Sequence, residues 1–214
     1  MKLHLGCGEQ YLKDYINIDF SIDKHTVQKQ TVADQLIDIQ DLKYSPKSIE
    51  EIRLHHVLEH FPRAIVCAFL TSWNIWLERN GKLRIEVPDF SKMSLQILSP
   101  FSTKRKKLLG NRHIFGSQEA PWATHFVGYT TEGLTYLLKT YGFKIDKIKK
   151  NNWKNTYNIE IFASKKTASK TVKAFELITK KYLELFLLDN SNSELRLLKI
   201  WMKIYKSQIN KCFK

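Results

Sequence analysis

Two glycines, Gly6 and Gly8, follow directly after a short run, Lys2–Leu5, that we predict to be a β-strand. A second predicted strand, Tyr15–Ile18, leads into Asp19. Glycine at such a turn lets the backbone approach a bound cofactor, and an acid at the tip of the next strand can accept both hydroxyls of a ribose. Asp19 lies only 11 residues after Gly8, which leaves no room for a full helix before the second strand. The spacing therefore disfavours the pyrophosphate site of NAD and favours a nucleoside cofactor without phosphates.

Strand and helix patterns alternate along the next part of the chain. Glu50–Leu54 and Lys82–Val87 read as strands, and Pro62–Arg79 between them carries apolar residues at helical spacing. We expect Asn80 and Gly81 to end this helix. This alternation of strand and helix is typical of a mainly parallel α/β sheet. The sheet is expected to finish with a helix over Thr131–Thr140 and an antiparallel pair of strands over Phe143–Ile148 and Asn158–Ala163.

The chain is expected to divide into a body, residues 1–166, and a basic, amphipathic helical extension, residues 167–214. Within the body, residues 91–128 form a poorly periodic insertion that we expect to cover the site. The net charge is +14, and residues 165–214 contribute +8 of it, from 12 Lys and Arg against four Asp and Glu. The extension could dock on the body, form a homodimer, or lie on an anionic membrane surface.

Composition and patterning exclude several classes of protein. A chain of 214 residues with 43% hydrophobic residues can bury a core and is not a disordered protein. The three cysteines lie far apart, without a Cys-x-x-Cys spacing, which argues against a disulfide framework or a cysteine zinc site. The N-terminus reaches Gly6 without an apolar signal segment, and no run approaches the length of a membrane span. We therefore expect a cytoplasmic protein, peripheral on the inner face of the membrane if the extension binds lipid.

Four short motifs follow one another in order: Leu5-Gly6-Cys7-Gly8, Asn17-Ile18-Asp19, His56-Val57-Leu58-Glu59-His60 and Val87-Pro88-Asp89. Together they resemble a small class I S-adenosylmethionine-dependent methyltransferase of the compact bacterial type, whose first helix is abridged and which often serves surface-polysaccharide pathways. The resemblance covers residues 2–165. It implies a Rossmann-like α/β fold and S-adenosyl-L-methionine as the cofactor.

The resemblance also implies which residues bind this cofactor. They are Gly6, Cys7 and Gly8 at the methionine part, Asp19 at the ribose, Asp38 and Ile39 at the adenine, and His55 or His56 at the far wall. Contacts beyond Gly8 are not carried over, because the family varies at the positions that Glu9-Gln10-Tyr11 occupies here.

The expected reaction is methylation of oxygen or nitrogen on a small acceptor or a glycan precursor, including phosphorylated or nucleotide-linked compounds. Because the methyl group is already activated, the protein mainly has to align the acceptor, and a base is needed only if the acceptor must lose a proton. His60 and His125 are the candidate bases, and Glu59 or Asp89 would orient the acceptor or a histidine. The alternatives are that Asp89 caps the following turn and that Glu59 and His60 simply begin a helix.

The sequence His56-x-x-Glu59-His60 also spells the inverted zinc-protease motif, in which two histidines one helical turn apart bind the metal. The third ligand would be Glu119 or Glu132. A metalloprotease has no use for the glycine turn or for Asp19, so we expect no metal site.

The net charge of +14, with aromatic residues such as Trp153 and Trp201 among the basic ones, also raises the possibility of a nucleic-acid-binding protein or nucleic-acid methyltransferase. Over half of this charge, +8, lies in residues 165–214, and no recognition module is apparent. No Asn-Pro-Pro-Tyr-like segment that could hold a flipped base follows the third strand. We therefore do not expect nucleic acid as a partner.

Overall fold

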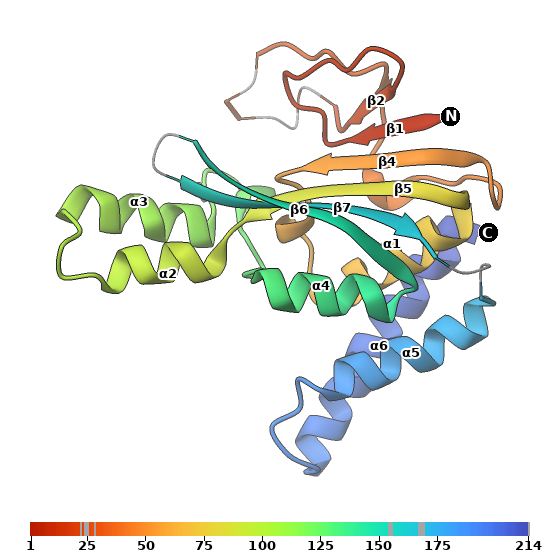
Figure 1. The fold of residues 1–214 in the computed structure, drawn as a ribbon. Helices are drawn as coiled ribbons and strands as arrows, with labels where there is room; N and C mark the ends of the chain where they lie inside the picture. Colours follow the sequence, from red (N-terminus) through yellow and green to blue (C-terminus); the bar gives the residue numbers. More distant parts are fainter. Residues whose placement is uncertain (22, 24–25, 28, 154–155, 167–169, 214) are drawn as a thin grey trace.

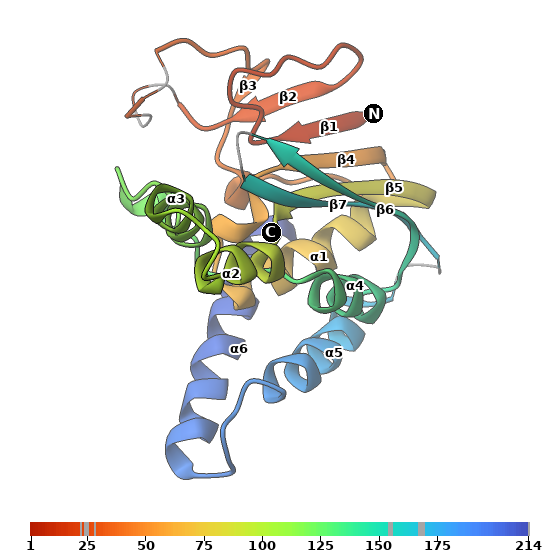
Figure 2. The same ribbon diagram turned by 60° about the vertical axis from the view of Figure 1, so that its left-hand side comes forward.

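A seven-stranded sheet organises the described part of the chain, in the order β3-β2-β1-β4-β5-β7-β6 (Figures 1 and 2). The structure is a computed structural model that describes residues 1–21, 23, 26–27, 29–153, 156–166 and 170–213. The strands are β1 (Lys2–Leu5), β2 (Ile16–Asp19), β3 (Gln35–Leu36), β4 (Ile49–His55), β5 (Leu77–Pro88), β6 (Phe143–Trp153) and β7 (Thr156–Lys165). Neighbours among β1 to β5 pair in parallel, whereas β7 is antiparallel to both β5 and β6. The predicted mainly parallel sheet with an antiparallel end is confirmed.

Helices cover one face of this sheet, and a further helix pair lies beyond the carboxyl ends of its parallel strands. The α-helices are α1 (Arg63–Trp76), α2 (Phe90–Leu98), α3 (Lys104–Phe115), α4 (Thr131–Thr140), α5 (Val172–Glu184) and α6 (Asn192–Phe213). Short 3-10 helices in the described ranges include η2 (Ile39–Asp41), η3 (Leu58–His60) and η4 (Pro121–Ala123). In both views α1, α4, α5 and α6 lie on the same side of the sheet, and the α2–α3 pair projects past the carboxyl ends of the parallel strands. No helix in the described ranges has the length and apolar character needed to cross a membrane.

The two faces of the sheet differ in polarity. Ile52 and Leu54 of β4 are fully buried, whereas Arg53 between them is partly exposed. On the neighbouring strand, Arg84 forms an ion pair with Glu160 of β7. Alternating burial of this kind is what a sheet with one covered face requires. Residues 6–15, all described, contain no helix, which confirms the abridged first helix.

The helix expected over Pro62–Arg79 ends earlier, at Trp76. Leu77 already pairs with Ile49 of β4, and the register then shifts so that Glu51 faces Lys82. Asn80 and Gly81 therefore form an irregularity inside β5 instead of a helix stop. The segment joins the sheet because its tertiary pairing with β4 outweighs its local helical pattern.

The insertion at residues 91–128 is more regular than expected, because it contains α3, η4 and most of α2. Thr103 accepts a hydrogen bond from the Lys106 backbone and so begins α3. Of the residues in α3, only Gly110 and Ile114 are buried. A helix with so little buried surface has a weak apolar pattern, which explains why the sequence did not reveal it.

The C-terminal helices pack on the body. The hydroxyl groups of Tyr205 in α6 and Thr71 in α1 lie 3.1 Å apart, and the Gln208 side chain donates a 2.6 Å hydrogen bond to the Gln40 carbonyl in η2. Among the possibilities left open for the extension, docking on the body is therefore observed. The expected boundary falls next to residues 167–169, which are outside the described residues.

Candidate active site

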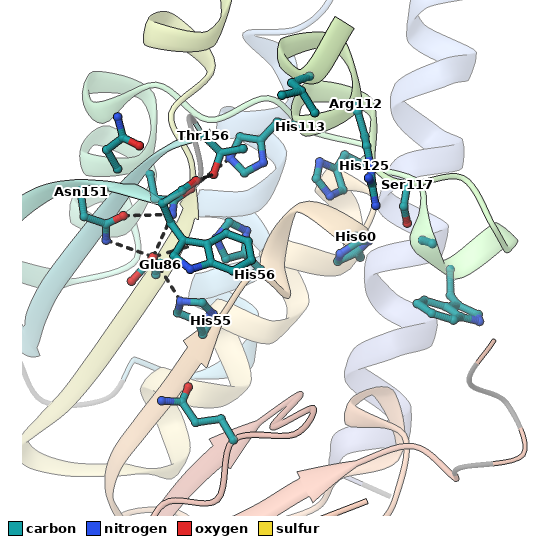
Figure 3. Close-up of a pocket in the computed structure, with 18 residues that line it drawn as sticks. His55, His56, His60, Glu86, Arg112, His113, Ser117, His125, Asn151 and Thr156 are labelled. Atoms are coloured by element: carbon teal, nitrogen blue, oxygen red, sulfur yellow. Dashed lines mark hydrogen bonds and ion pairs between the residues drawn. The ribbon is translucent and has the colours of Figure 1, made fainter. Parts of the chain in front are cut away.

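Two adjoining cavities lie at the carboxyl ends of the parallel strands, where α/β sheets of this kind bind ligands. The smaller, of about 520 Å³, is lined by the glycine turn after β1, the tip of β2, η2 and the segment around η3. The larger, of about 920 Å³, is lined by residues after β4, on β5, on α3, around η4 and on the β6–β7 hairpin (Figure 3). His56, His60 and Trp122 belong to both walls, so the cavities meet at these three residues.

The glycine turn is tied to β2. The amides of Gly6 and Cys7 both donate to the Ile18 carbonyl, at 2.9 and 3.1 Å, and the Gly8 amide donates to the Asp19 carboxylate at 2.7 Å. These N–H groups are therefore bonded within the protein, while Gly6 and Gly8 themselves lie on the wall of the smaller cavity. The Asp19 carboxylate also accepts a 2.8 Å hydrogen bond from the Phe20 amide, and Asp19 lines the smaller cavity.

The residues expected at the adenine lie in the same cavity as Asp19. Asp38 caps η2 by accepting a 2.8 Å hydrogen bond from the Gln40 backbone, and Ile39 follows it on the wall. The sequence did not identify the aromatic part of this wall. There Phe20 packs edge-on against Trp122, with ring centroids 5.4 Å apart.

Cys7 and His55 are not on the wall of the smaller cavity. The Cys7 side chain is only 3% exposed, and burial together with the charge of Asp19 raises the pKa of its thiol to about 12. It packs inside the turn and is not a nucleophile. His55 lines the larger cavity, so of the two histidines proposed for the far wall only His56 borders the smaller one.

Glu86 is the centre of a hydrogen-bonded network in the larger cavity. One of its oxygens lies 3.2 Å from His55 Nε2 and accepts from the side chains of Asn151 and Asn158 at 3.1 and 3.2 Å (Figure 3). Burial works to raise the pKa of Glu86, but these hydrogen bonds and the charges of the histidines lower it to about 2. Asn158 also contacts His113 Nε2 at 3.0 Å.

Sequence reasoning missed Glu86 and the two asparagines. Glu86 occupies a polar position of the strand just before Pro88, so its place at the strand tip was an available signal. Asn151 and Asn158 face each other in the register of the β6–β7 hairpin, which the sequence did not specify.

His56 connects this network to Glu59. Its Nδ1 lies 3.0 Å from Glu59 Oε1, and its Nε2 lies 3.9 Å from Glu86. Burial works to lower the pKa of His56, but the hydrogen bond that His56 donates to Glu59 and the two carboxylate charges raise it. Burial likewise opposes ionisation of Glu59, and the bond and charge of His56, with His60 and His125, hold its pKa below the usual value. His56 also has a left-handed backbone with φ of +54°, a strain typical of functional positions.

The structure brings three of the expected catalytic residues together. His60 and His125 lie with ring centroids 4.6 Å apart, and both flank the buried carboxylate of Glu59. The Phe126 amide donates a 2.8 Å hydrogen bond to the Glu59 carbonyl and so holds the loop of His125 against η3. Burial lowers the pKa of His125.

The inverted zinc-protease arrangement does not fit this geometry. That motif needs both histidines on one face of an α-helix, whereas His56 precedes a three-residue 3-10 helix that contains only His60 of the pair. Glu119 and Glu132, its expected third ligands, are not among the described groups that could share a metal ion with these histidines.

Asp89 lies apart from both cavities. Its carboxylate is fully buried, accepts a hydrogen bond from the Lys92 backbone to cap α2, and pairs with Lys150 at 3.4 Å. Of the two roles considered for Asp89, this placement supports the helix cap.

No protein-family model and no curated protein sequence matches this chain. Solved structures do match it in fold. An S-adenosylmethionine-dependent methyltransferase from Methanosarcina mazei has a TM-score of 0.50 at 15% identity and covers 77% of this chain and 92% of its own. One from Mesorhizobium loti scores 0.51 at 11% identity over 76% and 89%. A 1,6-didemethyltoxoflavin-N1-methyltransferase from Burkholderia thailandensis, solved with S-adenosylhomocysteine, scores 0.53 at 11% identity over 78% and 71%. With its strand order and its site at the carboxyl edge, the chain has the fold of the class I S-adenosylmethionine-dependent methyltransferases.

Proposed function

We propose that this chain is an S-adenosylmethionine-dependent methyltransferase that acts on a polar acceptor. The observation that carries the proposal is the junction of two cavities at His56, His60 and Trp122. The smaller cavity combines carboxylates with aromatic and aliphatic side chains, which suits a nucleoside. The larger one is rich in imidazole and amide groups, which suit a hydrogen-bonding acceptor.

The smaller cavity fits the cofactor, which when bound supplies a methyl group activated on a sulfonium. Asp19 would accept the ribose hydroxyls, and Asp38 and Ile39 would flank the adenine. A Cβ added to Gly8 would meet nothing within 4 Å, so the turn leaves open space for the methionine part. The Cys7 side chain would not contact the cofactor in this binding mode.

The acceptor in this proposal is a sugar hydroxyl of a glycan precursor. Trp122 and Trp153 line the larger cavity and offer flat faces, while Asn152 supplies an amide, a combination that suits sugar rings. Arg112 would pair with the phosphate of a phosphorylated or nucleotide-linked sugar. The basic run Lys104–Lys107 lies at the start of α3 and does not line the cavity. Glu59, His60 and His125 would orient the attacking hydroxyl and accept its proton.

Calorimetry with S-adenosylhomocysteine tests the cofactor site. Asp19→Ala is expected to weaken binding at least tenfold, because a charged hydrogen bond contributes about 1.5–3 kcal/mol. Asp146→Ala is the matched control, since Asp146 contacts Lys82, Lys144 and Ser164 and is on the wall of neither cavity. Failure of the wild-type protein to bind S-adenosylhomocysteine would overturn the proposal.

The acceptor class is tested by release of S-adenosylhomocysteine on mixing with candidate acceptors. Nucleotide-linked sugars are expected to be turned over faster than the same sugars without phosphate, and Arg112→Ala should remove that preference. Methylation of amines but not of sugar hydroxyls would refute the oxygen acceptor.

The extension is proposed to hold the enzyme at an anionic membrane surface. Its outer side carries exposed apolar residues beside lysines, with Leu188 91% exposed and Leu185 and Ile200 more than half exposed. Apolar residues flanked by basic ones suit the boundary of an anionic bilayer. Cosedimentation with vesicles containing anionic lipid tests this proposal, and a concentration-dependent dimer without vesicle binding would favour the homodimer instead.

A further inference from the structure

Three side chains converge where the two cavities meet. Glu59, His60 and His125 each offer one ligand atom, and these atoms lie within 4.8 Å of one another. His60 lines both cavities and His125 lines the larger one. A space enclosed by three such atoms has the size of a metal-ion site.

Glu59 has an oxygen that lacks a partner. Glu59 is 0% exposed, and its Oε1 lies 3.0 Å from His56 Nδ1. Oε2 is buried and has no hydrogen-bond partner among the described residues. A buried carboxylate oxygen is rarely left unsatisfied, because its desolvation is costly. We therefore expect a ligand other than the described side chains to bind Oε2.

Both histidines are oriented as metal ligands usually are. His60 Nδ1 lies 3.3 Å from the Thr124 carbonyl, and His125 has a hydrogen bond with the Ile114 carbonyl. When one ring nitrogen donates its proton to a carbonyl, the other keeps its lone pair for a metal. His56 likewise orients Glu59, through the hydrogen bond between His56 Nδ1 and Glu59 Oε1. The outer hydrogen bonds of a metal centre are therefore present around all three side chains.

The neighbouring cluster provides a contrast. His55, His56 and Glu86 are equally close together, but the Glu86 oxygen that faces them already accepts hydrogen bonds from Asn151 and Asn158. No oxygen of Glu86 is among the unsatisfied atoms of the described residues. That cluster is complete as an ion-pair network, whereas the one around Glu59 is not.

We propose that Glu59, His60 and His125 bind a divalent transition-metal ion, with Zn²⁺ as the reference case, and that the ion keeps an open coordination position toward the larger cavity. Two imidazoles and one carboxylate suit zinc and its neighbours, and three protein ligands leave room for a substrate oxygen. This departs from our expectation from sequence that no metal site is present.

The role of the ion rests on the proposed function, although its binding does not. A bound cation lowers the pKa of an oxygen that coordinates it. The O–H bond of the acceptor hydroxyl breaks, the electron pair stays on the coordinated oxygen, and the proton leaves to water in the cavity. The oxidation state of the ion does not change. In this mode His60 and His125 act as ligands and not as bases.

The test is titration of full-length, chelator-treated protein with Zn²⁺ in a calorimeter, and with Co²⁺ as a spectroscopic probe. We expect one equivalent to bind the wild type and binding to weaken at least 100-fold in His125→Ala and in Glu59→Gln. His55→Ala is the matched control, because it removes a histidine of the neighbouring cluster and should leave the affinity within about twofold.

Binding of S-adenosylhomocysteine by each variant keeps the outcomes distinct. If His125→Ala retains that binding and loses the metal, the site is supported and misfolding is excluded. Less than one equivalent in the wild type, or the same metal affinity in His125→Ala, would overturn the metal site whatever the cofactor result. Metal binding without S-adenosylhomocysteine binding would leave the metal site standing and remove the proposed function.

Discussion

Gly6 and Gly8 have the same backbone conformation but are needed for different reasons. Their φ angles are +64° and +55°, in the left-handed region that glycine tolerates best. A Cβ on Gly6 would lie 2.4 Å from Val57 Cγ2, whereas a Cβ on Gly8 would enter open space on the wall of the smaller cavity. Packing requires the first glycine, and the cavity volume requires the second.

Replacing each glycine with alanine separates these two effects. Gly6→Ala should lower the free energy of unfolding by about 3 kcal/mol, because the backbone penalty adds to overpacking against Val57. Gly8→Ala should lower it by only about 1 kcal/mol, yet weaken S-adenosylhomocysteine binding. Urea denaturation and calorimetry measure the two quantities. Equal losses of stability in both variants would show that the contact with Val57 does not constrain the turn.

The thiols of Cys7 and Cys67 are expected to be unreactive in the folded protein. Burial is the main cause that raises the pKa of each to about 12. At pH 8 only about one thiol in 10,000 would then be a thiolate, and the thiolate is the form that iodoacetamide attacks. The labelling rate should rise with pH up to the limit of folding and should increase strongly in urea. Fast labelling of Cys7 at pH 8 without denaturant would indicate an accessible, activated thiol.

Single residues show how far the sequence could predict the site. Asp19 could be placed because it ends a predicted strand, whereas Asp38 and Ile39 were expected beside it only through the family resemblance. Glu59 and His60 are adjacent in the sequence, but His125 is 65 positions after His60 and reaches it only through the loop that the Phe126 amide fastens to η3. A convergence of this kind depends on loop geometry, which no local pattern encodes.

At the scale of elements, the sequence predicts which segments are strands better than where they begin and end, since β5 begins five residues before its expected start and β6 ends five residues after its expected end. The alternating residues of β4 and β5 report directly which face is buried. The end of α1 could not be predicted, because Leu77 is apolar in either structure and its pairing with Ile49 decides the outcome. The α2–α3 pair was missed because its start depends on single side-chain caps, at Asp89 and Thr103, more than on apolar periodicity.

The cap on α2 gives a prediction for Asp89. Asp89→Ala should lower the free energy of unfolding by about 1–2 kcal/mol, because α2 loses its N-terminal hydrogen bond. Asp89→Asn should recover most of this stability, since an amide oxygen can still accept from the Lys92 backbone. Thermal denaturation and turnover are measured on both variants. Turnover that is lost in Asp89→Asn while stability is retained would restore a catalytic role for the carboxylate.

At the scale of the whole molecule, the extension is joined to the smaller cavity. Gln208 of α6 bonds the carbonyl of Gln40, and Gln40 itself lines that cavity. Lys211 pairs with Asp41 of the same short helix at 3.2 Å. The amphipathic pattern predicted that α6 exists, but such a pattern does not identify the surface against which the helix packs. Of the +8 of residues 165–214, +5 lies on α5 and α6, which also contribute residues to the core.

Because α6 completes the core, the body and the extension should unfold in one transition. Tyr205 is 1% exposed and its hydroxyl meets Thr71 of α1, so Tyr205→Ala should lower the free energy of unfolding by about 3–5 kcal/mol. Ile200→Ala, on the exposed side of the same helix, should change it by less than about 0.5 kcal/mol. Calorimetry and urea denaturation should each show a single transition in the wild type. Two separate transitions, with only the weaker one shifted by Tyr205→Ala, would mean that the extension is an independent unit whose removal leaves the cofactor site intact.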